Sequence, residues 1–354
     1  MRLRLISIAA AMPWLATAQA GNDKLVLPSR SNSSPDSAMP MPPQLAPLHH
    51  VNTSTGLSVA YYEAGPSNGR PVILCHGFPF SIETYASVVP VLTQHNYRVI
   101  VPYLRGYGET RILNVTAART AEQAALGSDL IALMDAMHID KAIVGGYDWG
   151  SVAVNVAAAL WPSRIIGMVA TSSYLIQNRA TAWDPSSADS EALMWYYYAF
   201  LTPRGAAGLA SDPKGWARSI WRKNSVEKPI DEAYFGRTAT AFNNPDYVDL
   251  AVNFYRNRLL YAPGAPEYAE LAAKLDRQPP ITVPSVTLDP ADDLILPPKN
   301  ASATASFFRN SRCHHIVRGA GHDIPHDAPL VFARAILEVD NLARVSNYTC
   351  PESL

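Results

Sequence analysis

The stretch Gly146-Tyr147-Asp148-Trp149-Gly150 restricts the fold of this chain more than any other. An apolar segment, "KAIVGGY", leads into it, and a segment with helical spacing, "SVAVNVAAALWP", follows it. A small residue on each side of a central reactive residue is typical of a sharp strand-to-helix turn that lifts the central side chain into a pocket. Serine is usual at that centre, whereas this chain has Asp148. An ordinary aspartate N-cap would also fit these five residues, so the rest of the chain has to decide.

Length and composition favour a globular protein with a large core. The chain has 354 residues, of which 48% are hydrophobic and 17% are charged. That is enough for one or two structural units, and it is unlike a disordered chain. Lys and Arg number 29 against 30 Asp and Glu, a net charge of −1. Without a basic surplus, partners such as nucleic acid or an anionic membrane surface are disfavoured.

The N-terminus is typical of a secreted protein. Residues 1–20 contain two arginines, an apolar stretch and the small-residue end Ala18-Gln19-Ala20, as in a secretory signal peptide. Pro13 interrupts this segment, which is short for a membrane anchor, so we expect no stable membrane insertion after its removal. Residues 21–47 are rich in Ser and Pro and predict a flexible or extended leader. Asn-X-Ser/Thr triplets mark the candidate glycosylation sites Asn52, Asn114, Asn300 and Asn347.

Three cysteines are too few for a disulfide scaffold. Cys75 ends the apolar run "PVILC" and is expected to be a buried core thiol. Cys313 and Cys350 are a candidate disulfide that would tie down a C-terminal tail, 346–354, in an oxidising compartment. No cysteine–histidine grouping has metal-ligand spacing, so we expect no metal and no cofactor.

Apolar runs alternating with helical segments predict an α/β fold with a mostly parallel sheet and helices on both faces. Between about Ser173 and Pro280 the pattern changes to helix-like, aromatic segments without a clear strand. A helical block between strands of one sheet is best explained as a cap over the carboxyl edge, where open α/β sheets bind ligands. The sequence therefore predicts a core at 48–172 and 281–345 and a helical cap at 173–280.

The sharp strand-to-helix turn predicted at Asp148 is called the elbow below. An acid and a histidine follow it, in the order nucleophile, acid, base. The segment "TLDPADDLILPP" places Asp292 and Asp293 at the end of a predicted strand. His322 lies in "AGHDIP" after another strand-like segment, and His326 is its nearest rival. His314 and His315 fall in a strand-like stretch and are expected to be packing or surface residues. The remaining histidines without a chemical context are His49, His50, His95 and His138.

These motifs together resemble the α/β-hydrolase superfamily from about His50 to Val345, and within it the epoxide hydrolase branch. The segments that carry the resemblance are "HGFP" at 76–79, "RGYG" at 105–108, "GYDWG" at 146–150, "DPADDLILPP" and "GHDIPHDAP". The resemblance implies Asp148 as nucleophile, His322 as general base and Asp293, rather than Asp292, as triad acid. It also implies that Phe78 and Trp149 supply the backbone N–H groups of an oxyanion hole.

The sequence departs from the family pattern at two positions. Tyr103 stands where aspartate is common, and Pro290 stands where glycine is common before the acid. Tyr103 is not expected to supply the supporting hydrogen bond that the family's aspartate makes. Pro290 is expected to alter the conformation of the loop that carries Asp292 and Asp293.

The cap segments resemble the two tyrosine motifs with which epoxide hydrolases protonate the epoxide oxygen. "MWYYYAF" places Tyr196 in the first motif and "NFYRNR" places Tyr255 in the second. Tyr197 and Tyr198 are the alternatives if the cap helix is rotated, and plain packing of cap on core is the competing explanation. The remaining residues expected in the substrate pocket are His76, Pro79, Trp195 and Tyr197.

A carboxylate at the elbow suits substitution at saturated carbon. It displaces a leaving group to form an ester, which water activated by a histidine then hydrolyses. Epoxides and alkyl halides both suit this chemistry, but a halide needs N–H donors whereas an alkoxide needs a proton. Many haloalkane dehalogenases have asparagine where Phe78 stands, and fluoroacetate-type dehalogenases usually have arginine where Trp149 stands.

The sequence therefore favours an epoxide hydrolase that acts on a small apolar epoxide and water. A dehalogenase, another α/β-hydrolase activity and a non-catalytic binding protein on the same fold are the alternatives. The family includes fungal enzymes that open epoxides in polyketide biosynthesis, so the resemblance also implies a role in secondary-metabolite biosynthesis.

Overall fold

The computed structural model describes residues 42–224, 229–345, 347–352 and 354. The predicted signal peptide and the leader up to residue 41 lie outside the described residues. The end of the predicted leader, residues 42–47, is not free. Leu45 is buried and its N–H donates to Glu83 Oε1 at 3.1 Å, while Arg237 Nη1 donates to the Pro42 carbonyl at 2.6 Å.

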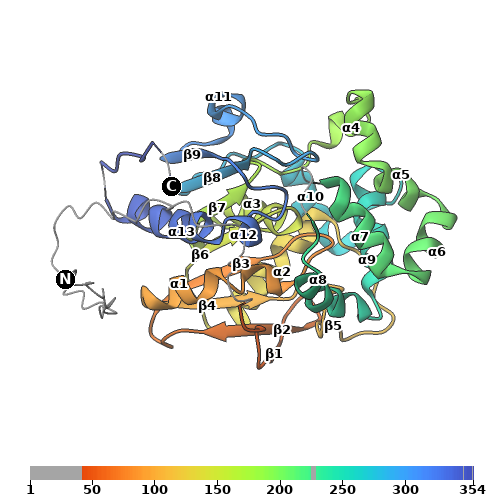
Figure 1. Ribbon diagram of the computed structural model, residues 1–354, viewed down its shortest axis with the longest axis horizontal. Coiled ribbons are helices and arrows are strands. Elements are labelled where there is room, and N and C mark those ends of the chain that lie inside the picture. The colour runs from red at the N-terminus through yellow and green to blue at the C-terminus, as the bar shows by residue number, and fades with distance from the viewer. Residues whose placement is uncertain (1–41, 225–228, 346, 353) are drawn as a thin grey trace, which may run out of the picture. The chain divides into compact units, whose positions relative to one another are not determined.

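The described residues form a nine-stranded, mostly parallel sheet, as the sequence predicted (Figure 1). Its spatial order is β1-β2-β4-β3-β6-β7-β8-β9, with β5 paired to β2. The pairs made by β2 are antiparallel, and all pairs from β4 across to β9 are parallel. The strands are β1 (His49–Asn52), β2 (Leu57–Ala64), β3 (Arg70–Cys75), β4 (Tyr97–Pro102), β5 (Arg111–Ile112), β6 (Ala142–Gly146), β7 (Ile165–Thr171), β8 (Ser285–Pro290) and β9 (Arg312–Val317).

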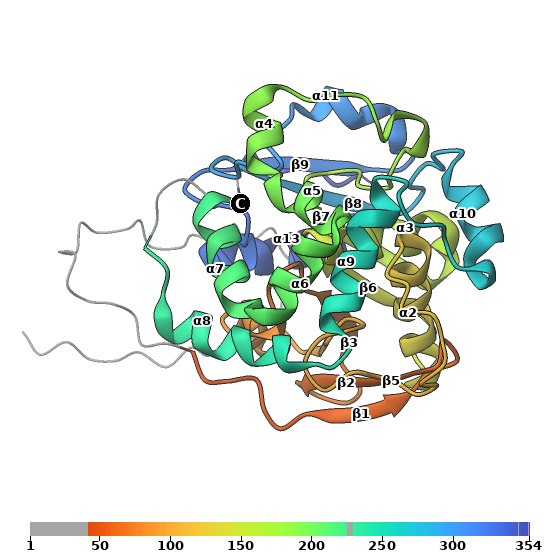
Figure 2. The ribbon, with the colours of Figure 1, turned by 90° about the vertical axis from the view of Figure 1, so that its right-hand side faces the viewer.

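Helices cover both faces of this sheet, which explains the apolar runs of the central strands β3 and β6. Every residue of β6 is buried. β8 is buried as well, although it carries the hydrogen-bonded polar residues Ser285, Thr287 and Asp289. The helices α2 (Gln123–Ala136) and α3 (Trp149–Leu160) pack together on one face, and α1 (Val88–Gln94) and α13 (Pro329–Arg344) cover the other (Figure 2). A strand buried on two faces has no polar side to alternate with, so its sequence is a short apolar run.

A run of helices separates β7 from β8 and lies together at one end of the sheet, on the right in Figure 1. These helices are α4 (Ala188–Leu193), α5 (Trp195–Leu201), α6 (Pro203–Ser211), α7 (Pro213–Asn224), α8 (Glu232–Thr238) and α9 (Tyr247–Arg258). The next helix, α10 (Ala269–Leu275), falls inside the predicted cap range 173–280 but packs against α2 and α3 of the core. The short helices α11 (Ala301–Thr304) and α12 (Ile324–Asp327) follow β8 and β9. Within the described residues, no helix combines the length and apolar character needed to cross a bilayer.

The C-terminal tail is joined to the sheet by a disulfide between Cys313, on β9, and Cys350. Cys75 is a buried free thiol at the end of β3, and burial raises its pKa to about 12. The asparagines of all four Asn-X-Ser/Thr triplets, which are Asn52, Asn114, Asn300 and Asn347, are exposed.

Candidate active site

Asp148 lies on the sharp turn between β6 and α3, with φ 50° and ψ −122°. A non-glycine residue with positive φ is uncommon, and such strain is frequent at functional sites. The flanking glycines are required by space. A Cβ on Gly146 would lie 2.4 Å from the carbonyl carbon of Gly150, and one on Gly150 would lie 1.9 Å from the Cys75 carbonyl oxygen. The backbone therefore approaches itself too closely for any side chain at these two positions.

The loop after β3 supplies a donor to the elbow. The Phe78 N–H donates to Asp148 Oδ1 at 2.6 Å. Trp149 is the first residue of α3, so its N–H has no partner within the helix. The Phe78 N–H thus contacts the elbow carboxylate, and the role of the Trp149 N–H in an oxyanion hole stays a prediction.

His76 supports this loop through its backbone contacts. The ring is fully buried, with Nδ1 3.0 Å from the Gly77 carbonyl and Nε2 accepting the Leu104 N–H at 3.1 Å. Burial lowers the pKa of His76 to about 4, against a smaller raising effect of the Gly77 hydrogen bond and Asp148. A neutral imidazole that is hydrogen-bonded through both ring nitrogens stabilises the loop, whereas the sequence placed His76 in the substrate pocket.

His322 connects the elbow to the acid loop. Its Nε2 lies 3.3 Å from Asp148 Oδ2, and its Nδ1 lies 2.8 Å from Asp293 Oδ2. The other oxygen of Asp293 accepts the N–H groups of Ile295 and Leu296 at 2.8 and 3.0 Å. Asp292, the alternative acid, is partly exposed and contacts the Ala320 carbonyl through its backbone N–H. The structure thus places Asp293, and not Asp292, against the imidazole.

The electrostatics of His322 follow from its two carboxylate neighbours. Burial alone lowers the pKa of its imidazole, but Asp293 and Asp148 together outweigh burial and raise the pKa well above 6.5. The charged imidazole is therefore favoured while Asp148 is an anion. The rival His326 stacks on the ring of Tyr234 at 3.7 Å instead.

Two of the predicted tyrosines lie over the elbow. Tyr196 on α5 and Tyr255 on α9 are buried, with their ring centroids 5.3 Å apart at 85°. Both rings pack against Phe78, at 6.0 and 5.2 Å. Burial is the largest cause that raises the pKa of each phenol well above 10, and neighbouring phenols and Asp148 add to it. Both hydroxyls therefore keep their protons at neutral pH.

The alternatives Tyr197 and Tyr198 have opposite surroundings. The Tyr197 ring lies 4.5 Å from that of Tyr255, and its pKa is raised by burial and, among further causes, by Asp148. Tyr198 is 44% exposed and its hydroxyl donates to Glu191. The structure thus brings Tyr196, Tyr197 and Tyr255 together and turns Tyr198 away.

Aromatic rings enclose the site, so that the Asp148 side chain is only 12% exposed. Trp149 stacks on Phe254 at 4.1 Å, and Trp195 packs between Tyr196 and Trp216. The buried indole Nε1 atoms of Trp149 and Trp195 have no hydrogen-bond partner among the described residues. Pro79 faces the cap through its carbonyl, which accepts the Trp221 Nε1–H at 3.0 Å.

The geometry agrees with a comparison against known families. The sequence pattern described as alpha/beta hydrolase fold matches residues 70–329, which is more than half of the chain. The chain belongs to the α/β hydrolase fold family. In this α/β hydrolase, His322 contacts both the elbow residue Asp148 and the acid Asp293.

Individual relatives place this α/β hydrolase more closely. A crystal structure of a proposed epoxide hydrolase from Klebsiella pneumoniae is 38% identical, with a TM-score of 0.80, and covers 83% of this chain and 97% of that one. Epoxide hydrolase A of Mycobacterium tuberculosis is 24% identical over 323 residues, covering 83% of this chain and 97% of the relative. A proposed epoxide hydrolase from Pseudomonas aeruginosa is 20% identical with a TM-score of 0.69, which shows the fold alone. The chain is an epoxide hydrolase-like α/β hydrolase.

A metal has one candidate position in the described parts of the α/β hydrolase. Ligand atoms of Cys313, Glu338 and Cys350 lie within 4.8 Å of one another. The two cysteines are joined in the disulfide, so they offer no thiolates, which are the form of cysteine that binds metal.

Sequence reasoning missed the carboxylate of Asp323, the residue after His322. Asp323 is buried, and its two oxygens accept the hydroxyls of Thr84 and Tyr234. Its position next to the histidine was the only signal in the sequence.

Proposed function

We propose that this α/β hydrolase opens an epoxide to a vicinal diol through an ester on Asp148. The observation that carries this proposal is the surroundings of the Asp148 carboxylate. A backbone N–H holds Oδ1, an imidazole faces Oδ2, and buried, protonated phenols lie above. A serine-type acyl transfer would not need such a carboxylate or the phenols.

In the first step, Asp148 Oδ2 attacks an epoxide carbon and the carbon–oxygen bond of the ring breaks. The pair of electrons goes to the epoxide oxygen, which receives a proton from Tyr196 or Tyr255. A proton donor is required because the alkoxide is a poor leaving group, and general acid catalysis by a positioned side chain contributes about 10²–10⁴-fold. The high pKa of both phenols keeps them protonated until the alkoxide forms.

In the second step, water attacks the ester carbonyl carbon of Asp148. His322 Nε2 takes one proton of that water, while Asp293 orients the ring and stabilises its charge. The negative charge develops on Oδ1, beside the Phe78 N–H. The N–H of Trp149, at the start of α3, is the second expected donor. Collapse breaks the bond between the carbonyl carbon and Oδ2, which takes the proton from His322 and leaves in the diol. The regenerated carboxylic acid of Asp148 gives its proton to the phenolate, which restores the phenol and the carboxylate. The sum is epoxide plus water giving diol.

A dehalogenase is the second candidate. Within the part of the chain that the structure describes, the indole N–H groups of Trp149 and Trp195 have no partner, and they are donors of the kind that a departing halide needs. The same Asp148 ester would serve both reactions. The two differ in what leaves the carbon, and therefore in whether the phenol protons matter.

The test compares diol formation from a panel of apolar epoxides with halide release from alkyl halides. Asp148→Asn is expected to abolish both reactions. Combining Tyr196→Phe with Tyr255→Phe is expected to slow ring opening by about 10²–10⁴-fold. Tyr198→Phe is the matched control, because it removes a cap phenol that faces solvent. Halide release without diol formation, or a double variant as fast as wild type, would favour the second candidate.

We also propose that the chain follows the secretory route and takes a small apolar epoxide, as in secondary-metabolite biosynthesis. The disulfide, the four exposed triplet asparagines and the aromatic enclosure support this. Expression with the natural N-terminus should yield secreted, glycosidase-sensitive protein. A deletion strain should accumulate an epoxide, and an unchanged metabolite profile would discard the biosynthetic role.

A further inference from the structure

The carboxylate of Asp323 lies directly beside the catalytic base in sequence, and it is only 7% exposed. It does not contact Asp148 or take part in the two steps above. Burying a carboxylate is unfavourable unless its oxygens are hydrogen-bonded. Burial accordingly raises the pKa of Asp323, an effect that His326, Thr84 and Tyr234 oppose.

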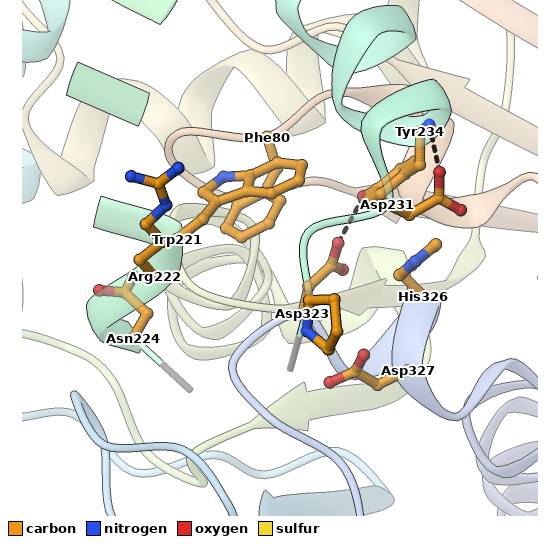
Figure 3. A pocket seen from close by; sticks show the side chains of 10 residues that line it. Phe80, Trp221, Arg222, Asn224, Asp231, Tyr234, Asp323, His326 and Asp327 are labelled. Atoms are coloured by element: carbon orange, nitrogen blue, oxygen red, sulfur yellow. Dashed lines mark hydrogen bonds between the residues drawn. The ribbon is translucent and has the colours of Figure 1, made fainter. Parts of the chain in front are cut away.

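The two oxygens of Asp323 are bonded to two different parts of the protein. Oδ1 accepts the hydroxyl of Thr84, which lies in the short 3-10 helix Ile82–Tyr85 that follows the oxyanion loop. Oδ2 accepts the hydroxyl of Tyr234, which lies on the cap helix α8 (Figure 3). Both donors are buried, at 1% and 3% exposure. One side chain therefore connects the base loop, which carries His322, with the 3-10 helix after the oxyanion loop and with the cap.

The backbone of Asp323 is fixed as well. Its carbonyl accepts the N–H groups of His326 and Asp327 in α12. The Tyr234 ring stacks on His326 at 3.7 Å and on Trp221 at 5.4 Å. With backbone and side chain both held, the residue before Asp323, which is His322, has little freedom to move.

We infer that Asp323 is a positioning residue that holds His322 against Asp148 and that Tyr234 completes this hold from the cap. This inference rests on the proposed function, because it assigns the contact to the hydrolysis of the Asp148 ester. That step needs His322 Nε2 to reach a water at the ester, and a misplacement of about 1 Å can cost roughly 10²-fold in rate.

A cavity of about 120 Å³ adjoins this contact, lined among others by Phe80, Trp221, Tyr234, Asp323 and His326 (Figure 3). Loss of the Tyr234 hydroxyl would leave Asp323 Oδ2 facing this space. Water entering it would compete for the carboxylate, so the base loop would lose its connection to the cap without a steric clash.

The kinetic test uses Asp323→Asn and Tyr234→Phe, with Tyr198→Phe as the matched control. Tyr198 is also a cap tyrosine that donates to a carboxylate, but it is exposed. The two test variants are expected to slow ester hydrolysis by about 10–100-fold and to leave ester formation within about 2-fold. kcat and KM then fall together, because the ester accumulates, and kcat/KM is preserved. A fall in kcat/KM with unchanged kcat, or no change at all, overturns the inference.

A second measurement needs no substrate. With labelled histidine, the Nδ1 proton that His322 shares with Asp293 should give a slowly exchanging signal by nuclear magnetic resonance. We expect this proton to exchange faster in Tyr234→Phe and Asp323→Asn, and at the wild-type rate in Tyr198→Phe. Thr84→Val, which removes the other hydroxyl donor, replaces Asp323→Asn if that variant fails to fold. Unchanged exchange in the folded variants overturns the inference.

The two failures are distinguishable. If wild type forms no diol and no ester on Asp148, the proposed function fails, while the exchange measurement still decides whether Asp323 positions His322. If wild type is active and the test variants match it, only the inference fails.

Discussion

The two oxygens of Asp148 have different neighbours. Oδ1 accepts the Phe78 N–H at 2.6 Å, whereas Oδ2 faces His322 Nε2 at 3.3 Å. The oxygen bound to the backbone is the one on which charge would develop during ester hydrolysis. Oδ2, beside the imidazole, is the oxygen available for attack, because the substrate can replace its contact with the protonated His322. One oxygen of the Asp148 carboxylate thus acts as the nucleophile, and the other carries the negative charge during ester hydrolysis.

The charge on Asp148 also controls the base. Asp148 contributes to the raised pKa of His322, and Asp293 contributes more. Ester formation removes the Asp148 charge, so the pKa of His322 should fall and the imidazole should lose its proton when a base is needed. Asp148→Asn mimics this neutral state. We expect a lower His322 pKa in Asp148→Asn than in wild type, measured by titration of labelled histidine. An equal or higher value would contradict this account.

The neighbouring acids Asp292 and Asp293 form a matched pair for a test. Asp293→Asn replaces the acceptor of the His322 Nδ1 proton by an amide, which can hold the ring in the wrong tautomer. By analogy with serine-type triads, we expect kcat to fall by about 10⁴-fold. Asp292→Asn should change kcat by less than about 2-fold, because that side chain is partly exposed and does not contact the imidazole. Equal losses in the two variants would contradict the assignment.

At the level of elements, the turn between β6 and α3 depends on its glycines. Gly150→Ala would place a methyl group 1.9 Å from the Cys75 carbonyl oxygen. We expect it to lower the free energy of unfolding by about 3 kcal/mol or more, measured by urea denaturation. Gly236→Ala is the control, because it lies in α8 with no atom within 4 Å of the added group. It should stabilise by up to about 1 kcal/mol. A similar effect of both substitutions would be contrary to this explanation.

The elements that sequence could predict are those in which burial is continuous. The apolar runs of β3 and β6 and the flanking glycines of Asp148 follow directly from buried strands and a tight turn. β1, with the sequence "HHVN", has no apolar run and exists because it pairs with β2. The sequence also does not predict that α10 packs on the core helices α2 and α3, because α10 is a helical segment like those of the cap.

The same limit applies to the site. The order of Asp148, Asp293 and His322 is readable because family motifs carry these residues. Which adjacent tyrosine of "MWYYYAF" faces Asp148 depends on the rotation of α5, a seven-residue helix that ends before Pro203. The bond from Tyr234 to Asp323 joins residues 89 positions apart, and no local pattern predicts it.

For the molecule as a whole, the described disulfide links the C-terminal tail to β9 across a separation of 37 residues. Closing such a loop restricts the unfolded chain and typically stabilises by about 2–4 kcal/mol. We expect Cys350→Ser to lower the free energy of unfolding by about this amount. kcat should stay unchanged, because Cys313 is the second residue of β9 and His322 follows the other end of this strand. Reductant should lower wild-type stability equally and leave the variant unaffected. A stable, reductant-insensitive wild type would contradict this role.

The most direct test of the central claim is the fate of oxygen in a single turnover. Enzyme in excess over an epoxide, in water enriched with heavy oxygen, should incorporate one heavy oxygen atom into the peptide that contains Asp148, as measured by mass spectrometry. The first diol should carry an oxygen from the enzyme. Heavy oxygen found only in the diol, with an unlabelled Asp148 peptide, would mean that water attacks the epoxide directly and would contradict the ester mechanism.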